Sequence, residues 1–438
     1  MNRVFIECTY VFDHPEVNSG IQRVVKNIIR ELPRVESNKF EYTPAVIKDN
    51  QLYSVKKMYT VDDRLSLSQK IKRNLTKVRN HYWLYHCKLE SYFPFSKSLN
   101  CRRGLYLLAK FGALALSFAL SLVSRPIVEN DFLIAVEAEA GDTIILLDAS
   151  WNDDFYTFLD GYKQRGVYIV TVIYDLIPIT NREFFDDQLV AMFSNWFKWV
   201  SNNSDGYIAI SKTVAAQFSG MLASQELRVC ADPYWVDSFY LGSDFHRHKD
   251  GLVRPVVAEV FQNESDVYLT VSTIEPRKNH ACIIDAFELL WGNGVDLSLC
   301  IVGKVGWKTE ELIKRIESHA EFNKRLFMFN DIDDSELEYC YQNSKALVFA
   351  SMAEGFGLPL VEAAQRGLPV ICSDIPVFSE VGGDNFYYFE LGSRQSLNEA
   401  ILNFRSQTTN SSVGNVKWLS WLESTQQLID VVDKNIIK

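Results

Sequence analysis

Two glutamates eight positions apart are the residues of this chain best suited to chemistry. Glu354 and Glu362 bound the stretch EGFGLPLVE, and the strand-like run ALVFAS ends just before it. Pro359 suits the first turn of a helix and Gly367 suits its end, so a helix is predicted from about Pro359 to Arg366. Glu354 then lies in a loop and Glu362 on the helix. Each carboxylate suits the paired hydroxyls of a ribose or hexose, although a surface or capping acid is the simpler alternative.

The residues between the two glutamates suit backbone contacts with a ligand. Gly355 and Gly357 leave room for backbone donors to approach sugar hydroxyls. The predicted helix N-terminus, at Gly357 and Leu358, directs free N–H groups outward, where a phosphate is favoured.

Two adjacent cations follow another predicted strand. In VYLTVSTIEPRKNH, Arg277 and Lys278 occupy the turn before a helix that starts near Asn279. Cations beyond the carboxyl end of a parallel strand lie where open α/β sheets bind ligands, and they suit a diphosphate. Two solvated surface charges are the alternative.

A glycine marks the start of a helix near the N-terminus. In EVNSGIQRVVKNIIREL, Gly20 precedes apolar residues at helical spacing. A glycine there lets a ligand approach the backbone, and the free N–H groups of the helix favour an anion. The full GxGxxG fingerprint is absent, so an ordinary strand-to-helix turn stays open as an alternative.

Two series of short apolar runs, separated by helical stretches, must position these residues. The first series is RVFIEC, YTPAVI, DTIILLD, VYIVTVIYD, GYIAIS and ELRVC, and the second is DVYLTVS, DLSLCIVG, RLFMF, ALVFAS, LPVICS and NFYYFE. Near-continuous apolar runs that alternate with helices predict parallel sheets buried on both faces. The expected fold class is α/β, with two doubly wound Rossmann-like domains.

A polar, glycine-containing stretch between the two series predicts a hinge near residues 242–264. The C-terminal VKWLSWLESTQQLIDVV predicts a helix that can pack across to the first domain, and its apolar stripe holds Trp418, Trp421, Leu422 and Leu428. We expect an N-terminal domain at 1–242 with a basic and apolar insertion at about 52–125, a C-terminal domain at 243–415, and a crossover helix at 416–438.

The composition is that of a folded protein of two or three domains, with 438 residues of which 47% are hydrophobic and 23% charged. A net charge of -10 argues against general nucleic-acid binding. The eight cysteines form no CxxC pair and several lie in apolar runs, which favours buried side chains in a reducing compartment. The opening MNRVFIECTY lacks the layout of a signal peptide, so a cytoplasmic location is expected.

Two patterns raise the question of a metal site. The acids of DID, Asp331 to Asp333, more simply form a loop and a helix N-cap. His246 and His248 have no third candidate ligand nearby in the sequence. We expect neither a metal nor a cofactor.

A basic segment and an apolar run lie inside the expected insertion. Residues 56–103 carry twelve Lys or Arg against three acids, a local charge of +9, and residues 104–123 read GLYLLAKFGALALSFALSLV. A membrane span is disfavoured because Lys110 lies within the run and because a span would divide one sheet between two sides of a membrane. A core helix and an interfacial helix both remain open. The interleaved basic and aromatic residues favour an anionic membrane surface.

These motifs together resemble the retaining nucleotide-sugar glycosyltransferases of the GT-B fold, specifically family 4, whose signature is two Glu separated by seven residues. The resemblance rests on NSGIQRVV, VIYDLIPI, YIAISK, STIEPRKN, IVGKVGW, DSELEYCYQNSKALVFASMAEGFGLPLVEAA and SEVGG, which come in the family's order. It implies an N-terminal domain on the acceptor side and a C-terminal domain that binds the nucleotide sugar. The domains would face each other across a cleft, with the C-terminal helix packing back on the N-domain.

The resemblance also implies roles for individual residues. Glu354 is expected to contact the transferred sugar and Glu362 the ribose hydroxyls. Arg277 and Lys278 would neutralise the departing diphosphate, with Gly20 beside it. The remaining donor-binding candidates are Gly355, Phe356, Gly357, Leu358, Tyr174 and Asp175.

The sequence departs from the common family pattern at two places. Tyr174 precedes Asp175 where many relatives have a His, which puts that contact with the donor sugar in doubt. Ser272, Thr273 and Ile274 replace a common GRL, so Arg277 is expected to serve in place of the missing Arg. These departures keep a catalytically silent GT-B scaffold open as an alternative.

Relatives with GIQRVV, YDLIPI and STIEPRKN look most like bacterial mannosyltransferases of surface-polysaccharide assembly, including the lipopolysaccharide O-antigen. The resemblance therefore implies transfer of a hexose, with mannose from GDP-mannose as the first expectation, to a lipid-linked or growing surface glycan with retention of configuration. A UDP-sugar or dTDP-rhamnose is the alternative donor. The expected location is peripheral, at the cytoplasmic face of the membrane.

Overall fold

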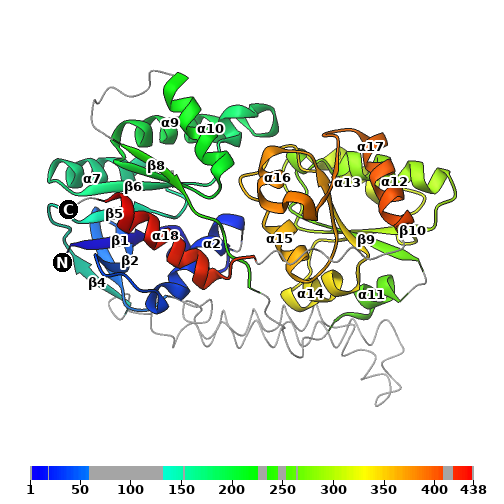
Figure 1. Cartoon of the computed structure of the whole chain (residues 1–438), viewed down its shortest axis with the longest axis horizontal. Coiled ribbons are helices and arrows are strands. Elements are labelled where there is room, and N and C mark those ends of the chain that lie inside the picture. The colour runs from blue at the N-terminus through cyan, green and yellow to red at the C-terminus, as the bar shows by residue number, and fades with distance from the viewer. Residues whose placement is uncertain are drawn as a thin grey trace, which may run out of the picture.

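The computed structural model describes residues 2–17, 19–58, 132–150, 153–224, 234–244, 253–262, 265–407 and 418–436. Several expectations fall outside these residues: those for most of the basic segment and the apolar run, for the strand ELRVC, for His246 and His248, and for Cys87, Cys101 and Cys230. Figure 1 shows two sheet-based domains side by side.

The N-domain is built on one sheet with strand order β4-β3-β2-β1-β5-β6-β7-β8. The strands are β1 (Arg3–Glu7), β2 (Glu41–Lys48), β3 (Gln51–Val55), β4 (Leu133–Val136), β5 (Thr143–Leu146), β6 (Tyr168–Ile173), β7 (Gly206–Ala209) and β8 (Trp235–Ser238). The helices are α1 (Thr9–Asp13), α2 (Gly20–Glu31), η1 (Leu32–Arg34), α7 (Asp153–Gln164), α8 (Ile177–Thr180), η4 (Arg182–Phe184), α9 (Asp187–Asn203) and α10 (Lys212–Ser224).

The prediction of a wholly parallel N-domain sheet is wrong at one edge. Strands β2, β3 and β4 pair antiparallel, and residues Lys48 and Gln51 face each other across a two-residue turn. Asp49 and Asn50 in that turn have φ angles of 50° and 55°. Positive φ at both central residues is the geometry of the tight turns that join antiparallel strands, and Asp and Asn tolerate it better than most residues.

The C-domain sheet confirms all six predicted strands of the second series. Its order is β11-β10-β9-β12-β13-β14, and every pair is parallel. The strands are β9 (Asp266–Val271), β10 (Leu297–Val302), β11 (Leu326–Phe329), β12 (Ala346–Phe349), β13 (Val370–Ser373) and β14 (Tyr387–Phe389).

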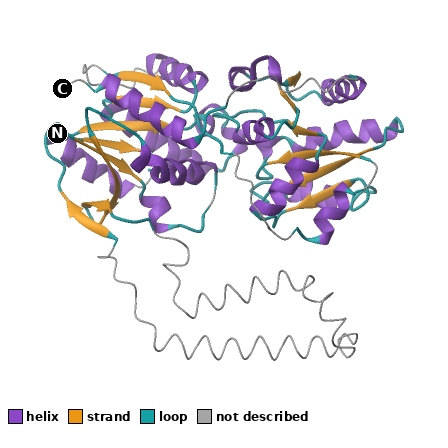
Figure 2. Ribbon diagram, turned by 60° about the horizontal axis from the view of Figure 1, so that its bottom comes forward, coloured by secondary structure: helices purple, strands orange, loops and turns teal. Residues whose placement is uncertain are grey.

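Helices cover both faces of the C-domain sheet (Figure 2). They are α11 (Pro255–Ala258), η5 (Glu259–Phe261), η6 (Pro276–Lys278), α12 (His280–Gly292), α13 (Glu310–Glu317), α14 (Asp334–Asn343), α15 (Leu358–Gln365), α16 (Pro376–Gly382), η7 (Gly383–Asn385) and α17 (Arg394–Ser406). Alternate strand residues enter separate apolar clusters: Leu269 packs on one face and Tyr268 on the other. Burial on both faces explains the nearly continuous apolar strands.

The C-terminal helix α18 (Trp421–Asn435) packs on the N-domain, as predicted (Figure 1). Trp421 and Leu428 join the same buried cluster as Val24 and Ile28 of α2. Trp418 lies before the helix rather than in it, and its ring stacks on Phe386 of the C-domain, with the centroids 6.0 Å apart. The chain therefore crosses between the domains within the few residues before α18.

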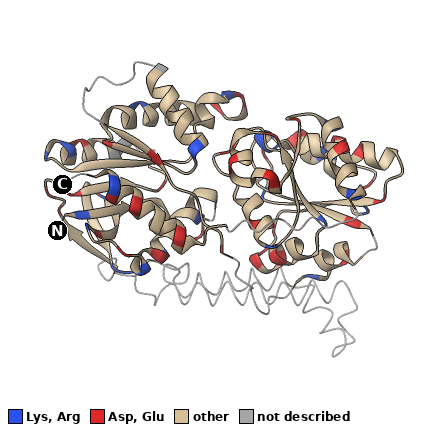
Figure 3. Cartoon of the chain, viewed as in Figure 1, with Lys and Arg blue, Asp and Glu red and all other residues tan. Residues whose placement is uncertain are grey.

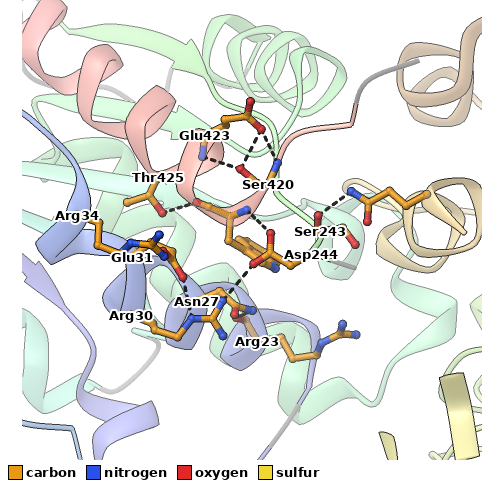
Figure 4. Close-up of polar contacts among 12 residues, drawn as sticks. Arg23, Asn27, Arg30, Glu31, Arg34, Ser243, Asp244, Ser420, Glu423 and Thr425 are labelled. Atoms are coloured by element: carbon orange, nitrogen blue, oxygen red, sulfur yellow. Dashed lines mark hydrogen bonds and ion pairs between the residues drawn. The ribbon is translucent and has the colours of Figure 1, made fainter. Parts of the chain in front are cut away.

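The hinge and α18 are fastened to α2 by polar contacts (Figure 4). Asp244 accepts hydrogen bonds from the backbone of Trp421 at 3.0 Å and from Arg30 at 3.3 Å. Ser420 and Glu423 form a reciprocal capping box at the start of α18. Gly242 lies so close to this start that an added Cβ would lie 2.6 Å from the Ser420 carbonyl oxygen. A larger residue at position 242 therefore has no room.

Two other sequence interpretations can be compared with the structure. Asp333 is the N-cap of α14 and forms a capping box with Glu336, which confirms the N-cap interpretation. Cys8, Cys282, Cys300, Cys340 and Cys372 are free and buried, as expected. Acidic and basic residues are interspersed along both domains (Figure 3). Within the described part of the chain, no helix is long and apolar enough to cross a membrane.

Candidate active site

The predicted cations and Glu354 meet at the carboxyl ends of two neighbouring strands. Strands β9 and β12 pair in parallel, so the segments that follow them adjoin. The backbone N–H of Met352, after β12, donates to the carbonyl of Arg277, after β9, at 2.8 Å. Asn279, with a φ of 54°, turns the chain from η6 into α12. Local backbone geometry thus fixes Arg277 and Lys278 beside the glutamate loop.

Glu354 is held by three side chains of its own domain. Arg277 Nη1 lies 2.9 Å from Glu354 Oε2, and Lys278 Nζ pairs with Oε1. The Ser351 hydroxyl donates to Oε1 at 2.6 Å. The Glu354 side chain is only 9% exposed, so this carboxylate is ordered and largely shielded from water.

The charge state of Glu354 follows from these partners. Burial raises the pKa of Glu354, but the charges of Arg277 and Lys278 outweigh burial and lower that pKa to about 2. Burial also lowers the pKa of Lys278, and the neighbouring Arg277 lowers it further. Glu354 is therefore ionised across the physiological pH range.

Glu275 is a second carboxylate that pairs with Arg277. Its Oε1 lies 2.6 Å from Arg277 Nε, and the side chain is 3% exposed. Burial raises the pKa of Glu275, while Arg277 and Lys278 lower it. Arg277 therefore bridges two carboxylates, Glu275 and Glu354, which fixes the plane of its guanidinium.

Glu362 lies on α15, as predicted, but its partners differ from those of Glu354. Tyr341 donates a hydrogen bond from its hydroxyl to Glu362 Oε2 at 3.0 Å. Arg23, from α2 of the N-domain, pairs with Oε1. The two side chains are 37% and 7% exposed for Arg23 and Glu362 respectively. This carboxylate is therefore held from across the interface between the domains.

The contact between Arg23 and Glu362 was not predicted from the sequence, although the position of Arg23 beside Gly20 was a signal that it could lie at the site. Arg23 lies three residues after Gly20, the first residue of α2, and residues three apart share one face of a helix. An added Cβ at Gly20 would meet no atom within 4 Å. Packing alone therefore does not require glycine at this helix start, and Arg23 projects from the same first turns.

The loop between the two glutamates contacts the N-domain through its backbone. An added Cβ at Gly355 would lie 2.0 Å from the Tyr174 carbonyl oxygen, and the Gly355 carbonyl accepts from Ser211 at 2.9 Å. Gly357 has a φ of 94° and is the N-cap of α15, which starts at Leu358. Phe356 is buried in the N-domain cluster. Glycine is thus required at Gly355 by close approach and at Gly357 by conformation.

Tyr174 and Asp175 form the N-domain side of the site. The Tyr174 hydroxyl donates to the Leu147 carbonyl at 2.7 Å, so this side chain points into the N-domain. Burial raises the pKa of Asp175, while Arg277 opposes this effect from across the interface. Asp175 therefore faces the Glu354 cluster, whereas Tyr174 presents its backbone carbonyl.

Further contacts join the two domains around the site. Glu380 of α16 accepts from the backbone N–H groups of Lys212 and Thr213, each at 2.7 Å, at the start of α10. Trp307 donates from its indole to the Phe184 carbonyl at 2.8 Å. The candidate residues therefore lie between two domains that are in direct contact.

Comparison with known proteins finds a family that resembles the C-domain. Residues 257–411 match the family described as glycosyl transferases group 1. The matched residues span the C-domain, with its Arg277 and Lys278 turn and its two glutamates.

The curated relatives are named as mannosyltransferases. WbdA of Escherichia coli, a serotype-specific mannosyltransferase, is 28% identical over 428 residues, covering 96% of this chain and 45% of WbdA. A second WbdA from Escherichia coli is 32% identical over 308 residues, covering 69% of this chain and 36% of that protein. The chain thus spans less than half the length of these relatives.

Solved structures show the same fold. Anabaena HepE, in complex with UDP and glucose, superposes with a TM-score of 0.58 at 14% identity, with 99% of each chain covered. Sucrose-phosphate synthase from Thermosynechococcus elongatus gives a TM-score of 0.57 at 13% identity, again with 99% of each chain covered. The predicted fold, two doubly wound domains of GT-B type, is confirmed.

Proposed function

We propose that the chain is a retaining glycosyltransferase that moves mannose from GDP-mannose to a hydroxyl of a lipid-linked or growing surface glycan. One observation carries the proposal: an ionised Glu354, fixed by Arg277 and Lys278, lies where the two domains meet. The mannosyltransferase names of the relatives support the choice of sugar.

The reaction breaks the bond between the sugar C1 and the diphosphate oxygen and forms a bond from C1 to the acceptor oxygen. The acceptor attacks the face that the diphosphate leaves, so the configuration is retained. The leaving diphosphate takes the acceptor proton and departs with the nucleoside. The chain therefore has to stabilise positive charge at C1 and negative charge on the phosphates.

The candidate residues divide these tasks. Arg277 and Lys278 supply fixed positive charge for the leaving diphosphate. Gly20, which has no side chain, leaves space for the diphosphate at the start of α2. Glu354 supports the developing charge on the sugar, and Glu362 accepts from the ribose hydroxyls. Fixed charges in a shielded site need little rearrangement during the reaction, which makes them effective. No metal is assigned to these steps.

A donor panel tests this proposal. GDP-mannose, UDP-glucose and dTDP-rhamnose are each incubated with a membrane extract as acceptor source, and nucleotide release and product mass are measured with and without EDTA. We expect release from GDP-mannose, unchanged by EDTA, and a product heavier by one hexose per transfer. Nucleotide release from UDP-glucose or dTDP-rhamnose instead would change the assigned donor to that sugar nucleotide. The absence of turnover with every donor would favour a catalytically silent GT-B scaffold.

We also propose that the basic segment at residues 56–103 docks the enzyme on an anionic cytoplasmic leaflet. The support is its sequence charge of +9 beside aromatic residues. The full chain is expected to co-sediment with vesicles that contain anionic lipid and not with neutral vesicles. Co-sedimentation that persists after the cations are neutralised would contradict this proposal.

A further inference from the structure

A pocket of about 300 Å³ lies beside the candidate active site, between the start of α10, the end of β8 and α18. Its volume is at the lower end of the range for small-molecule sites. Figure 1 shows β8 between α10 above and α18 below. Since α10 and the segment after β8 follow the carboxyl ends of strands, the pocket opens at the sheet edge where α/β domains bind ligands.

The charges that line the pocket are balanced. Lys212 and Lys434 face Asp237 and Asp430 among the lining residues. Lys434 Nζ lies 3.0 Å from Asp237 Oδ2, so this pair neutralises itself. The lining therefore has no net positive charge to attract a phosphate or a nucleotide, and an anion would lie close to two carboxylates. The balance favours a neutral ligand.

Several polar groups of the pocket are left to bind a ligand. Gln427 accepts from the backbone N–H of Tyr240 at 2.8 Å with its carbonyl oxygen, which leaves its NH₂ group to donate. The Lys212 ammonium lies 5.9 Å from the Tyr240 ring centroid and pairs with no carboxylate in the described part of the chain. Asp430 accepts from Gln426 at 2.9 Å through Oδ1. The pocket thus offers both donors and acceptors beside an aromatic ring.

The pocket is connected to the candidate active site through two of its residues. The rings of Tyr240 and Phe356 have centroids 6.2 Å apart, and Phe356 lies in the loop between the two glutamates. The backbone N–H of Lys212 donates to Glu380 of the C-domain at 2.7 Å. A ligand on Tyr240 therefore lies one side chain away from the donor loop.

From these observations we propose that the pocket binds a neutral oligosaccharide, namely sugar units of the acceptor glycan remote from the reacting hydroxyl. Neutral charge, mixed hydrogen-bonding groups and an aromatic ring together suit a chain of sugar hydroxyls and C–H faces. This inference rests on the proposed function, because it assumes that the acceptor is a glycan. It assigns to α18 a binding role besides its structural one.

The test compares a long and a short acceptor in the full chain. The probes are an α-linked mannotetraose and a methyl mannoside, and the variant is the double substitution Lys212→Ala with Asp430→Ala, both exposed positions. The matched control is Lys198→Ala with Asp187→Ala on α9, also exposed. We expect the variant to raise the KM of the tetraose about 10-fold, the effect of losing one or two hydrogen bonds. The KM values of GDP-mannose and methyl mannoside should stay within about 2-fold.

Direct binding separates this inference from the proposed function. Saturation-transfer NMR with the tetraose should give a signal for the wild type and the control and a weakened signal for the double variant, whether or not transfer occurs. An equal signal in all three proteins, or an equal KM for the tetraose, would overturn the pocket assignment. Absence of transfer in the wild type with intact tetraose binding would instead overturn the enzymatic proposal alone.

Discussion

Glu354 and Glu362 lie eight residues apart, yet the structure holds them by different means. Glu354 pairs with Arg277 and Lys278, which belong to the same domain. Glu362 pairs with Arg23, which belongs to the other domain. The first carboxylate is therefore positioned by the folding of the C-domain, whereas the second also depends on how the two domains face each other. The rate of transfer is expected to depend on Glu354, and the affinity for the donor is expected to depend on Glu362.

Removing a cation from the Glu354 cluster is expected to have a larger effect than removing the cation that pairs with Glu362. Lys278→Met leaves Glu354 with Arg277 and Ser351 as partners and removes one fixed positive charge from the leaving diphosphate. We expect the transfer rate to fall about 100- to 1,000-fold, as when one fixed donor to a developing anion is lost. Rates at saturating GDP-mannose measure this effect. The control is Lys314→Met, an exposed lysine of the same domain, and equal rates in the two variants would contradict the role of Lys278.

Removing the cation that reaches across to Glu362 is expected to act on donor binding. Arg23→Ala removes the cation that holds Glu362 in place from the other domain. We expect the KM of the donor to rise about 10-fold with kcat changed by less than about 3-fold. The Arg23 side chain is 37% exposed. Salt therefore screens its charge, and the difference in donor KM between the variant and the wild type should become smaller at high salt. The control is Arg165→Ala, whose arginine lies 3.9 Å from Glu137 within its own domain. A fall in kcat at unchanged KM would contradict the assignment of Arg23 and Glu362 to donor binding.

The stability of the chain in acid provides a smaller test. The pKa of Glu354 in the folded chain is about 2, below its ordinary value of 4.5. Its contribution to stability is therefore fully present above pH 4.5 and is lost as the pH falls toward 2. We expect Glu354→Gln to flatten the fall in Tm between pH 5 and pH 3 relative to wild type. Parallel curves of Tm against pH for the two proteins would show that Glu354 is not held as described.

The C-domain was the part most accessible to prediction. Its six strands are buried on both faces, so each one appears as a short apolar run in the sequence. The position of Glu354 in a loop and of Glu362 on a helix followed from Pro359 and Gly367. The roles of these residues came from family resemblance and stay predictions.

The missed features depend on contacts between distant segments. Strands β3 and β4 pair with each other although residues 56–132 separate them. The turn at Asp49 and Asn50 was the local signal for this antiparallel edge. The Arg23 contact was not predictable from either domain alone, because it depends on the relative placement of α2 and α15.

The most direct test compares Glu354→Gln and Glu362→Gln side by side, with kcat for transfer and the dissociation constant of GDP-mannose measured for each. We expect Glu354→Gln to lower kcat about 1,000-fold, with donor affinity within about 3-fold of wild type. Glu362→Gln is expected to weaken donor affinity about 10- to 100-fold, with kcat at saturation within about 10-fold. If both substitutions changed the same parameter to the same extent, the separate roles assigned to the two carboxylates would be wrong.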